Sequence, residues 1–315
     1  MLTMQPAWHW AKTDFRAMNT DIYAWLYSPA ENSQAILYDV AVMFQAMDNR
    51  LSRFQPDSEL SALNRSGKPF VASHTLFAVL EAASWAAEVS GGIFEPAILP
   101  ALERAGYDRT FERVAKAGPA WSIDQCPRSM VGRFKQITLN PVRRLVDKPA
   151  GMKIDLGGIG KGWAVDCAAN RLAGLGPFLL NAGGDLYAYG TPPGASGWPV
   201  TLAHPHADDL VLAKLRLKDR AVATSSLARR QWRRGEQLLH HLIDPRCGRP
   251  AETDLLAVTV IADRVYQAEV LAKTALIMGA ETGLDYLQSL SRVEGLLLTK
   301  AGQVRQTSGL TAYFT

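Results

Sequence analysis

The most informative stretch of the sequence is Asp155-Leu156-Gly157-Gly158-Ile159-Gly160-Lys161-Gly162-Trp163-Ala164-Val165-Asp166, which lies between a short apolar run and an expected helix over residues 161–174. Closely spaced glycines let a ligand approach the backbone. A helix start carries unpaired N–H groups and partial positive charge, and Lys161 adds a full charge, which suits a phosphate. The alternative is a tight strand-to-helix turn with Lys161 in water. The glycine spacing matches neither the dinucleotide-binding fingerprint nor the Walker loop.

Two further turns carry polar residues of chemical interest. In Asn181-Ala182-Gly183-Gly184-Asp185, the aspartate either orients amides of a ligand or simply ends the turn. In the second turn, His240 and His241 stand at a predicted strand end, just before Asp244-Pro245. A histidine with a pKa near neutrality can act as a general base. The alternative for either histidine is a structural role.

A predicted helix over residues 265–279 is mostly apolar, with Glu269 and Lys273 as its main polar exceptions. Residues four apart lie on one face of a helix. One interpretation is a surface ion pair, which contributes little to stability. The other is a charged pair directed into a site, since so apolar a helix is expected to be buried.

Composition limits the classes of function. The chain has 315 residues with 34 basic and 30 acidic side chains, a net charge of +4, which does not by itself indicate nucleic-acid binding. The densest basic stretch is either a solvated turn or strand edge, or a surface for an anionic ligand or partner. This stretch contains Arg229, Arg230, Arg233 and Arg234.

The N-terminus and the cysteines indicate a cytoplasmic location. The first residues lack the basic and apolar regions of a signal peptide, and no run reaches the roughly 18 apolar residues of a membrane span. The three cysteines fit neither a zinc pattern nor a disulfide framework, so we expect reduced thiols. They are Cys126, Cys167 and Cys247.

Strand and helix patterns alternate without a regular βαβ rhythm, which predicts an α+β fold. A first strand is expected within residues 15–27, and helices are expected over 33–50, 74–89, 161–174, 265–279 and 281–289. The irregular middle, residues 106–150, contains Pro119, Pro127, Pro141 and Pro149. We treat it as a possible boundary between two lobes of a single domain over residues 1–315.

Eight segments in order resemble the FAD:protein FMN transferases, also called the ApbE family. The resemblance implies an α+β protein of two intimate lobes of mixed sheets and helices, with FAD in the cleft between them. It also implies that FMN passes from FAD to a Ser or Thr hydroxyl of an acceptor flavoprotein, that AMP leaves, and that Mg²⁺ sits on the pyrophosphate. The segments are Met18–Thr20, Phe54–Asn64, Gly92–Pro96, Asp155–Asp166, Ala182–Asp185, Ala223–Ser226, His241–Gly248 and Ala268–Gly279.

The resemblance also implies roles for individual residues. His241 resembles the base that takes the proton of the acceptor hydroxyl. The metal would lie at the Gly158 carbonyl, Glu269 and the position of Lys273. The residues expected to contact FAD are Met18 and Phe54 near its rings, the backbone of Ile93, Phe94 and Glu95, the backbone of Ile243, and Asp155, Lys161 and Asp185.

Some positions depart from the family pattern. Glu269 replaces Asp and can still bind a hard cation through oxygen. Lys273 replaces Thr, and its ammonium has donors but no acceptor, so it would repel a metal and could replace part of its charge. Glu95 replaces Asp, and Asn19 replaces Gly. Lys273 and Glu95 favour an alternative to transfer: an FAD-binding homologue that acts as a flavin carrier, sensor or redox-complex partner. A further alternative is hydrolysis of FAD to FMN and AMP, which would use the same groups with water as the acceptor.

Overall fold

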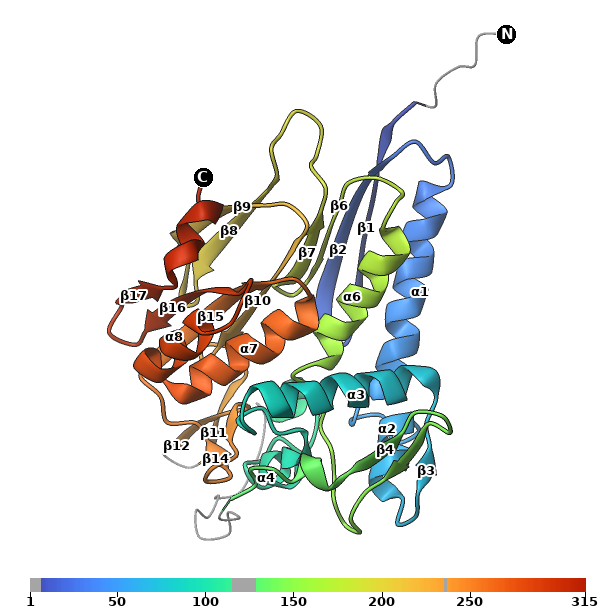
Figure 1. Ribbon diagram of the computed structural model, residues 1–315, viewed down its shortest axis with the longest axis vertical. Coiled ribbons are helices and arrows are strands. Elements are labelled where there is room, and N and C mark those ends of the chain that lie inside the picture. Colours follow the sequence, from blue (N-terminus) through green and yellow to red (C-terminus); the bar gives the residue numbers. More distant parts are fainter. Residues whose placement is uncertain (1–6, 115–128, 235–236) are drawn as a thin grey trace.

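The computed structural model describes residues 7–114, 129–234 and 237–315, and its main feature is an eight-stranded sheet (Figure 1). Each pair of neighbouring strands is antiparallel. In spatial order the strands are β1 (His9–Ala17), β2 (Thr20–Ser28), β6 (Phe178–Ala182), β7 (Asp185–Tyr189), β10 (Arg220–Ser226), β15 (Leu255–Ala262), β16 (Glu294–Thr299) and β17 (Val304–Gln306).

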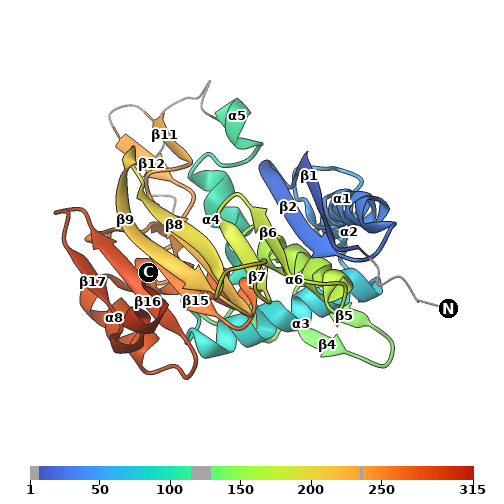
Figure 2. The ribbon, with the colours of Figure 1, turned by 90° about the horizontal axis from the view of Figure 1, so that it is seen from above.

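Both faces of the sheet are covered, which explains why all residues of the apolar strand β15 are buried. Four helices lie on one face (Figure 1): α1 (Ser33–Leu51), α6 (Gly160–Leu172), α7 (Val265–Met278) and α8 (Ala280–Gln288). The hairpin of β8 (Trp198–His204) and β9 (Ala207–Leu217) packs on the other face (Figure 2), where Trp198 and Leu217 join an apolar cluster with Leu186 and Ile261.

The remaining elements lie mainly at the lower end of the molecule in Figure 1. The helices are α2 (Glu59–Arg65), α3 (His74–Val89), α4 (Leu99–Arg104), α5 (Phe111–Val114) and the 3₁₀ turns η1 (Pro96–Ile98), η3 (Phe134–Gln136) and η4 (Ser308–Tyr313). The strands are β3 (Phe70–Val71), β4 (Thr138–Asn140), β5 (Leu145–Asp147), β11 (Gln231–Arg234), β12 (Gln237–His240), β13 (Ile243–Asp244) and β14 (Arg249–Pro250). Over the described ranges, no helix combines the length and apolar character needed to cross a bilayer.

The α+β prediction is confirmed, and the five predicted helices occur within two residues of their expected ends. The single strand expected over residues 15–27 is wrong, because the chain reverses at Met18-Asn19 and forms the β1–β2 hairpin. Both turn residues have positive φ angles, 50° and 58°, as the common two-residue hairpin turn requires. Cys167 and Cys247 are free thiols, whereas Cys126, Pro119 and Pro127 lie outside the described residues. A lobe boundary within 106–150 stays a prediction.

The helices α6 and α7 are joined at the end of the glycine-rich stretch. The Asp166 carboxylate accepts hydrogen bonds from the amides of Val265 and Tyr266, both at 3.0 Å, and so holds the first turn of α7. At Gly162, a Cβ atom would lie 2.6 Å from the Tyr266 backbone, a distance that real Cβ atoms do not reach. Only glycine therefore lets the two helices approach this closely.

Replacing Asp166 with alanine should lower the free energy of unfolding by about 1–3 kcal/mol, because two amides lose their acceptor in a dry helix contact. Urea denaturation measures the change. Asp39→Ala is the matched control: Asp39 pairs with Arg171 between α1 and α6, but both side chains are half exposed. Such a pair contributes about 0–1 kcal/mol. Equal losses in the two variants would contradict this account of the helix contact.

Candidate functional site

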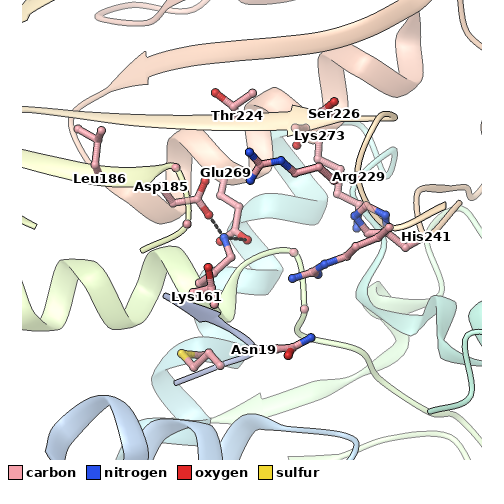
Figure 3. Close-up of a pocket in the computed structure, with 18 of the residues that line it drawn as sticks. Asn19, Lys161, Asp185, Leu186, Thr224, Ser226, Arg229, His241, Glu269 and Lys273 are labelled. Carbon is pink, nitrogen blue, oxygen red and sulfur yellow. Dashed lines mark hydrogen bonds and ion pairs between the residues drawn. The ribbon is translucent and has the colours of Figure 1, made fainter. Parts of the chain in front are cut away.

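A cavity of about 1420 Å³ lies between the β1–β2 turn, the glycine-rich stretch, strand β8, the segment after β10, and helix α7. Its volume exceeds the roughly 300–1000 Å³ typical of pockets for drug-sized ligands, so it has room for a larger molecule. Charged side chains from several of these elements point into it (Figure 3). The basic lining residues are Arg16, Arg53, Lys161, Arg229, Arg230 and Lys273, and the acidic ones are Asp48, Asp155, Asp185 and Glu269.

The glycine-rich stretch forms one wall of the cavity through Gly157, Gly158 and Gly160. None of these three residues has a positive φ angle, so left-handed backbone does not explain the glycines. Limited space explains the glycine at position 158, where a Cβ atom would lie 2.9 Å from Lys273 Nζ and 3.2 Å from the Phe94 ring. The groups that approach Gly158 closely are side chains of this protein, and the approach of a ligand to this stretch stays a prediction.

Lys161 is held by two carboxylates at the start of α6. Its ammonium forms ion pairs with Asp185 and, at 3.3 Å, with Glu269 (Figure 3). The second oxygen of Glu269 accepts a hydrogen bond of 2.9 Å from the Gly162 amide. Burial lowers the pKa of Lys161, and the Glu269 carboxylate opposes that shift. Lys161 is therefore a partly buried cation, held in place at the cavity wall by two carboxylates.

Asp155 is paired with Arg53, a residue that the sequence analysis missed. Arg53 Nε lies 2.7 Å from the carboxylate, and both side chains are largely buried. The guanidinium also lies 4.1 Å from the centre of the Phe54 ring and 4.7 Å from that of Tyr107. Asp155 further accepts a hydrogen bond from the Gly157 amide. The only signal in the sequence was the position of Arg53 directly before the Phe54 segment.

His241 lines the cavity as a neutral imidazole. Burial holds its pKa well below 6.5, and the charges of Arg230 and Lys273 act in the same direction. The ring hydrogen-bonds to the Arg230 backbone, whereas its buried Nδ1 has no hydrogen-bond partner in the parts of the chain that the structure describes. A neutral imidazole with an unpaired nitrogen can accept a proton from a bound molecule.

The first half of the basic stretch faces the cavity. Arg229 and Arg230 belong to its lining, and Figure 3 shows Arg229 among the side chains drawn around it. Arg230 has a φ angle of 54°, which is uncommon for a residue other than glycine and frequent at functional sites. These positions favour the interpretation of Arg229 and Arg230 as part of a surface for an anionic ligand.

Most of the residues proposed from the sequence meet at this cavity. Met18, Phe54, Asp155, Gly158, Lys161, Asp185, His241, Glu269 and Lys273 line it. Among the described lining residues we do not find Ile93, Phe94, Glu95 or Ile243. Phe94 reaches Gly158 and Lys273 from behind the wall. The Glu95 carboxylate accepts hydrogen bonds from the amides of Ala97 (2.9 Å) and Phe134 (3.0 Å), and burial raises its pKa.

Comparison with known proteins identifies the family. The family model described as "ApbE family" matches residues 18–297. The chain is similar to an FAD:protein FMN transferase of Treponema pallidum, with 30% identity over 298 residues, 90% of this chain and 82% of that protein. It is also similar to an FAD:protein FMN transferase of Vibrio cholerae, with 24% identity over 85% of this chain and 80% of that protein.

Solved structures show the same fold. The ApbE protein of Thermotoga maritima matches with a TM-score of 0.87 and 23% identity, and the match covers 98% of this chain and 100% of that one. The flavin transferase ApbE of Vibrio cholerae matches with a TM-score of 0.83 and 20% identity, covering 98% and 100%. At this identity the likeness concerns the fold alone, and it confirms the ApbE-like α+β architecture.

The turn at Met18-Asn19 yields a prediction for the mouth of the cavity. Asn19→Val should lower the free energy of unfolding by about 1–2 kcal/mol, because a β-branched residue is strained at the positive φ angle of this position. Asn19→Gly should leave stability nearly unchanged. Thermal or urea denaturation checks both. Asp14→Val, at an exposed position of the neighbouring strand β1, serves as the control and should change little. A loss in Asn19→Gly equal to that in Asn19→Val would contradict the explanation.

Proposed function

The chain belongs to the ApbE family, and from this premise we propose that it is an FAD:protein FMN transferase, which moves FMN from FAD to a Ser or Thr hydroxyl of an acceptor flavoprotein and releases AMP. The observation that carries the proposal is the cavity in which the neutral imidazole of His241 lies among fixed cations. Phosphoryl transfer depends mainly on positioning and on neutralising phosphate charge, and this lining offers both. The cations are Lys161, Lys273, Arg229 and Arg230.

In the proposed complex, FAD occupies the cavity with its rings near Met18 and Phe54. Asp155, Lys161 and Asp185 contact the cofactor or hold the groups that do. Ile93, Phe94, Glu95 and Ile243 are not among the lining residues, so in the proposed complex Phe94 acts through Gly158 and Lys273, which its ring approaches. The volume of about 1420 Å³ supports a dinucleotide as the occupant.

In the proposed chemical step, one proton moves and one group leaves. The acceptor hydroxyl oxygen forms a bond to the phosphorus on the flavin side of the diphosphate. The bond from that phosphorus to the bridging oxygen breaks, and AMP leaves with the electron pair. His241 takes the hydroxyl proton, and the cationic side chains stabilise the charge that develops on the phosphate oxygens.

The resemblance also implies Mg²⁺ at Gly158, Glu269 and position 273, and the residues present do not fit that ion. Both carboxylate oxygens of Glu269 are engaged, one by Lys161 and one by the Gly162 amide. Lys273 brings an ammonium against Gly158. Within the described ranges, no group of three or more His, Cys, Asp or Glu side chains is placed to hold a metal. The proposed reaction therefore contains no step through a metal.

A transfer assay tests the function. The protein is incubated with FAD and an acceptor flavoprotein domain, and covalent flavin is read as fluorescence of the acceptor band in a denaturing gel. We expect one AMP per flavin attached, and no labelling of an acceptor whose Ser or Thr is replaced by Ala. Failure to label, under conditions in which the Treponema pallidum relative labels the same acceptor, would count against transfer.

A second candidate, FAD binding without transfer, is favoured by the lysine at position 273. It predicts FAD bound in the cavity and no AMP release with any acceptor. Hydrolysis of FAD is distinguished by AMP released in the absence of an acceptor. The same experiment, with AMP and covalent flavin measured in parallel, separates the three activities.

Replacing His241 with glutamine should lower the transfer rate by about 10²–10⁴-fold and change FAD affinity little, because the imidazole acts on the acceptor proton. The wild-type rate should stay constant as pH falls towards 6.5 and decline only below it. The sign follows from the pKa of His241, which lies well below 6.5, so the base stays neutral over that range. Stopped assays across pH measure the profile. If the transfer rate declined with a midpoint above pH 6.5, and the decline persisted in His241→Gln, the decline would reflect the titration of another group.

A further inference from the structure

The side chain of Lys273 has an environment unlike that of the other cavity cations. The residue is only 9% exposed and lies in the middle of α7, yet it belongs to the cavity lining. Its ammonium forms neither a hydrogen bond nor an ion pair with any residue of the described ranges. The ammonium does make a cation–π contact with the Phe94 ring, whose centre lies 5.3 Å from Nζ. A buried ammonium without a paired anion is costly.

The surroundings of Lys273 favour its charged form only from a distance. Burial lowers its pKa, and the carboxylates of Asp155 and Glu269 oppose that shift. Both carboxylates are already engaged, Asp155 with Arg53 and Glu269 with Lys161. The described ranges therefore leave the ammonium without a paired anion, and an anion bound in the cavity would supply one.

The position of Nζ defines where that anion binds. A Cβ atom on Gly158 would lie 2.9 Å from Nζ, so the ammonium lies against the glycine-rich stretch. The same stretch contains Lys161. Figure 3 shows Lys273 and Lys161 entering the same cavity, with Glu269 between them and Arg229 nearby. An oxygen-rich, doubly charged group such as a diphosphate fits a site with several separate cations.

We propose that the Lys273 ammonium binds the diphosphate of FAD in the place of a divalent cation, so that this chain binds FAD and transfers FMN without a divalent metal. The inference rests on the proposed function for its transfer part, whereas its binding part stands alone. A tethered ammonium supplies one positive charge at a fixed position, and Arg229 and Arg230, which also line the cavity, supply more. The charge neutralisation that phosphoryl transfer needs then comes from side chains alone.

The first test uses the wild-type protein. FAD binding is measured by isothermal titration calorimetry in EDTA and in excess MgCl₂, and Mn²⁺ binding is measured by electron paramagnetic resonance with and without FAD. We expect equal FAD affinities within about twofold and no stoichiometric Mn²⁺. FAD affinity that rises about tenfold or more with Mg²⁺, or one bound Mn²⁺ per chain, would overturn the proposal.

The second test uses three variants. Lys273→Met should weaken FAD binding about tenfold or more in EDTA, and Mg²⁺ should not restore it. Lys273→Thr replaces the cation with a neutral hydroxyl and should show the same loss in EDTA. Lys153→Met is the matched control, because Lys153 pairs with Glu103 at the surface and does not line the cavity. FAD affinity in EDTA that is unchanged in both Lys273 variants would refute the role of the ammonium.

Transfer assays in EDTA and in Mg²⁺ separate this inference from the proposed function. Equal transfer in both conditions supports both proposals. Transfer that occurs only in Mg²⁺ refutes the inference and leaves the function intact. Metal-independent FAD binding with no transfer in either condition refutes the function and supports the binding role of Lys273.

Discussion

The close contact between α6 and α7 is the constraint on which the rest of the site depends. Glycine at position 162 leaves room for the Tyr266 backbone, and Asp166 binds the first amides of α7. This contact sets Lys161, at the start of one helix, opposite Glu269, on the other. A cavity cation and its counter-ion are thus positioned by backbone packing, which holds them more rigidly than long side chains on loops could.

Within the part of the chain that the structure describes, some of the cations that line the cavity are paired with carboxylates, and others are not. Asp155, Asp185 and Glu269 each neutralise a neighbouring cation, Arg53 or Lys161. Further positive charge lies on Lys273, Arg229 and Arg230. Burial lowers the pKa of His241 most, and the charges of Arg230 and Lys273 lower it further. The protein therefore keeps the His241 imidazole neutral next to a region that attracts anions, and the proposed phosphoryl transfer would use both.

Much of this arrangement could be predicted from the sequence, since it depends on local patterns. The helix over 74–89 and the glycine-rich turn follow from periodicity and glycine spacing. The β1–β2 hairpin was missed because its turn, Met18-Asn19, lacks the usual glycine. Arg53 and the engagement of Glu269 were missed for another reason: their partners are about a hundred residues away in sequence, and no spacing rule reports such contacts.

The two walls of the cavity differ in how freely they can change. The glycine-rich wall also forms the seam between two core helices, so a larger residue at Gly162 would disturb packing and ligand geometry together. Another part of the lining, Arg229 and Arg230, lies in the connection between β10 and β11, where Leu227 and Ala228 pack on core clusters and the two arginines do not. Related proteins that bind different ligands should therefore differ in sequence mainly in that connection. The residues at the contact between α6 and α7 should change less.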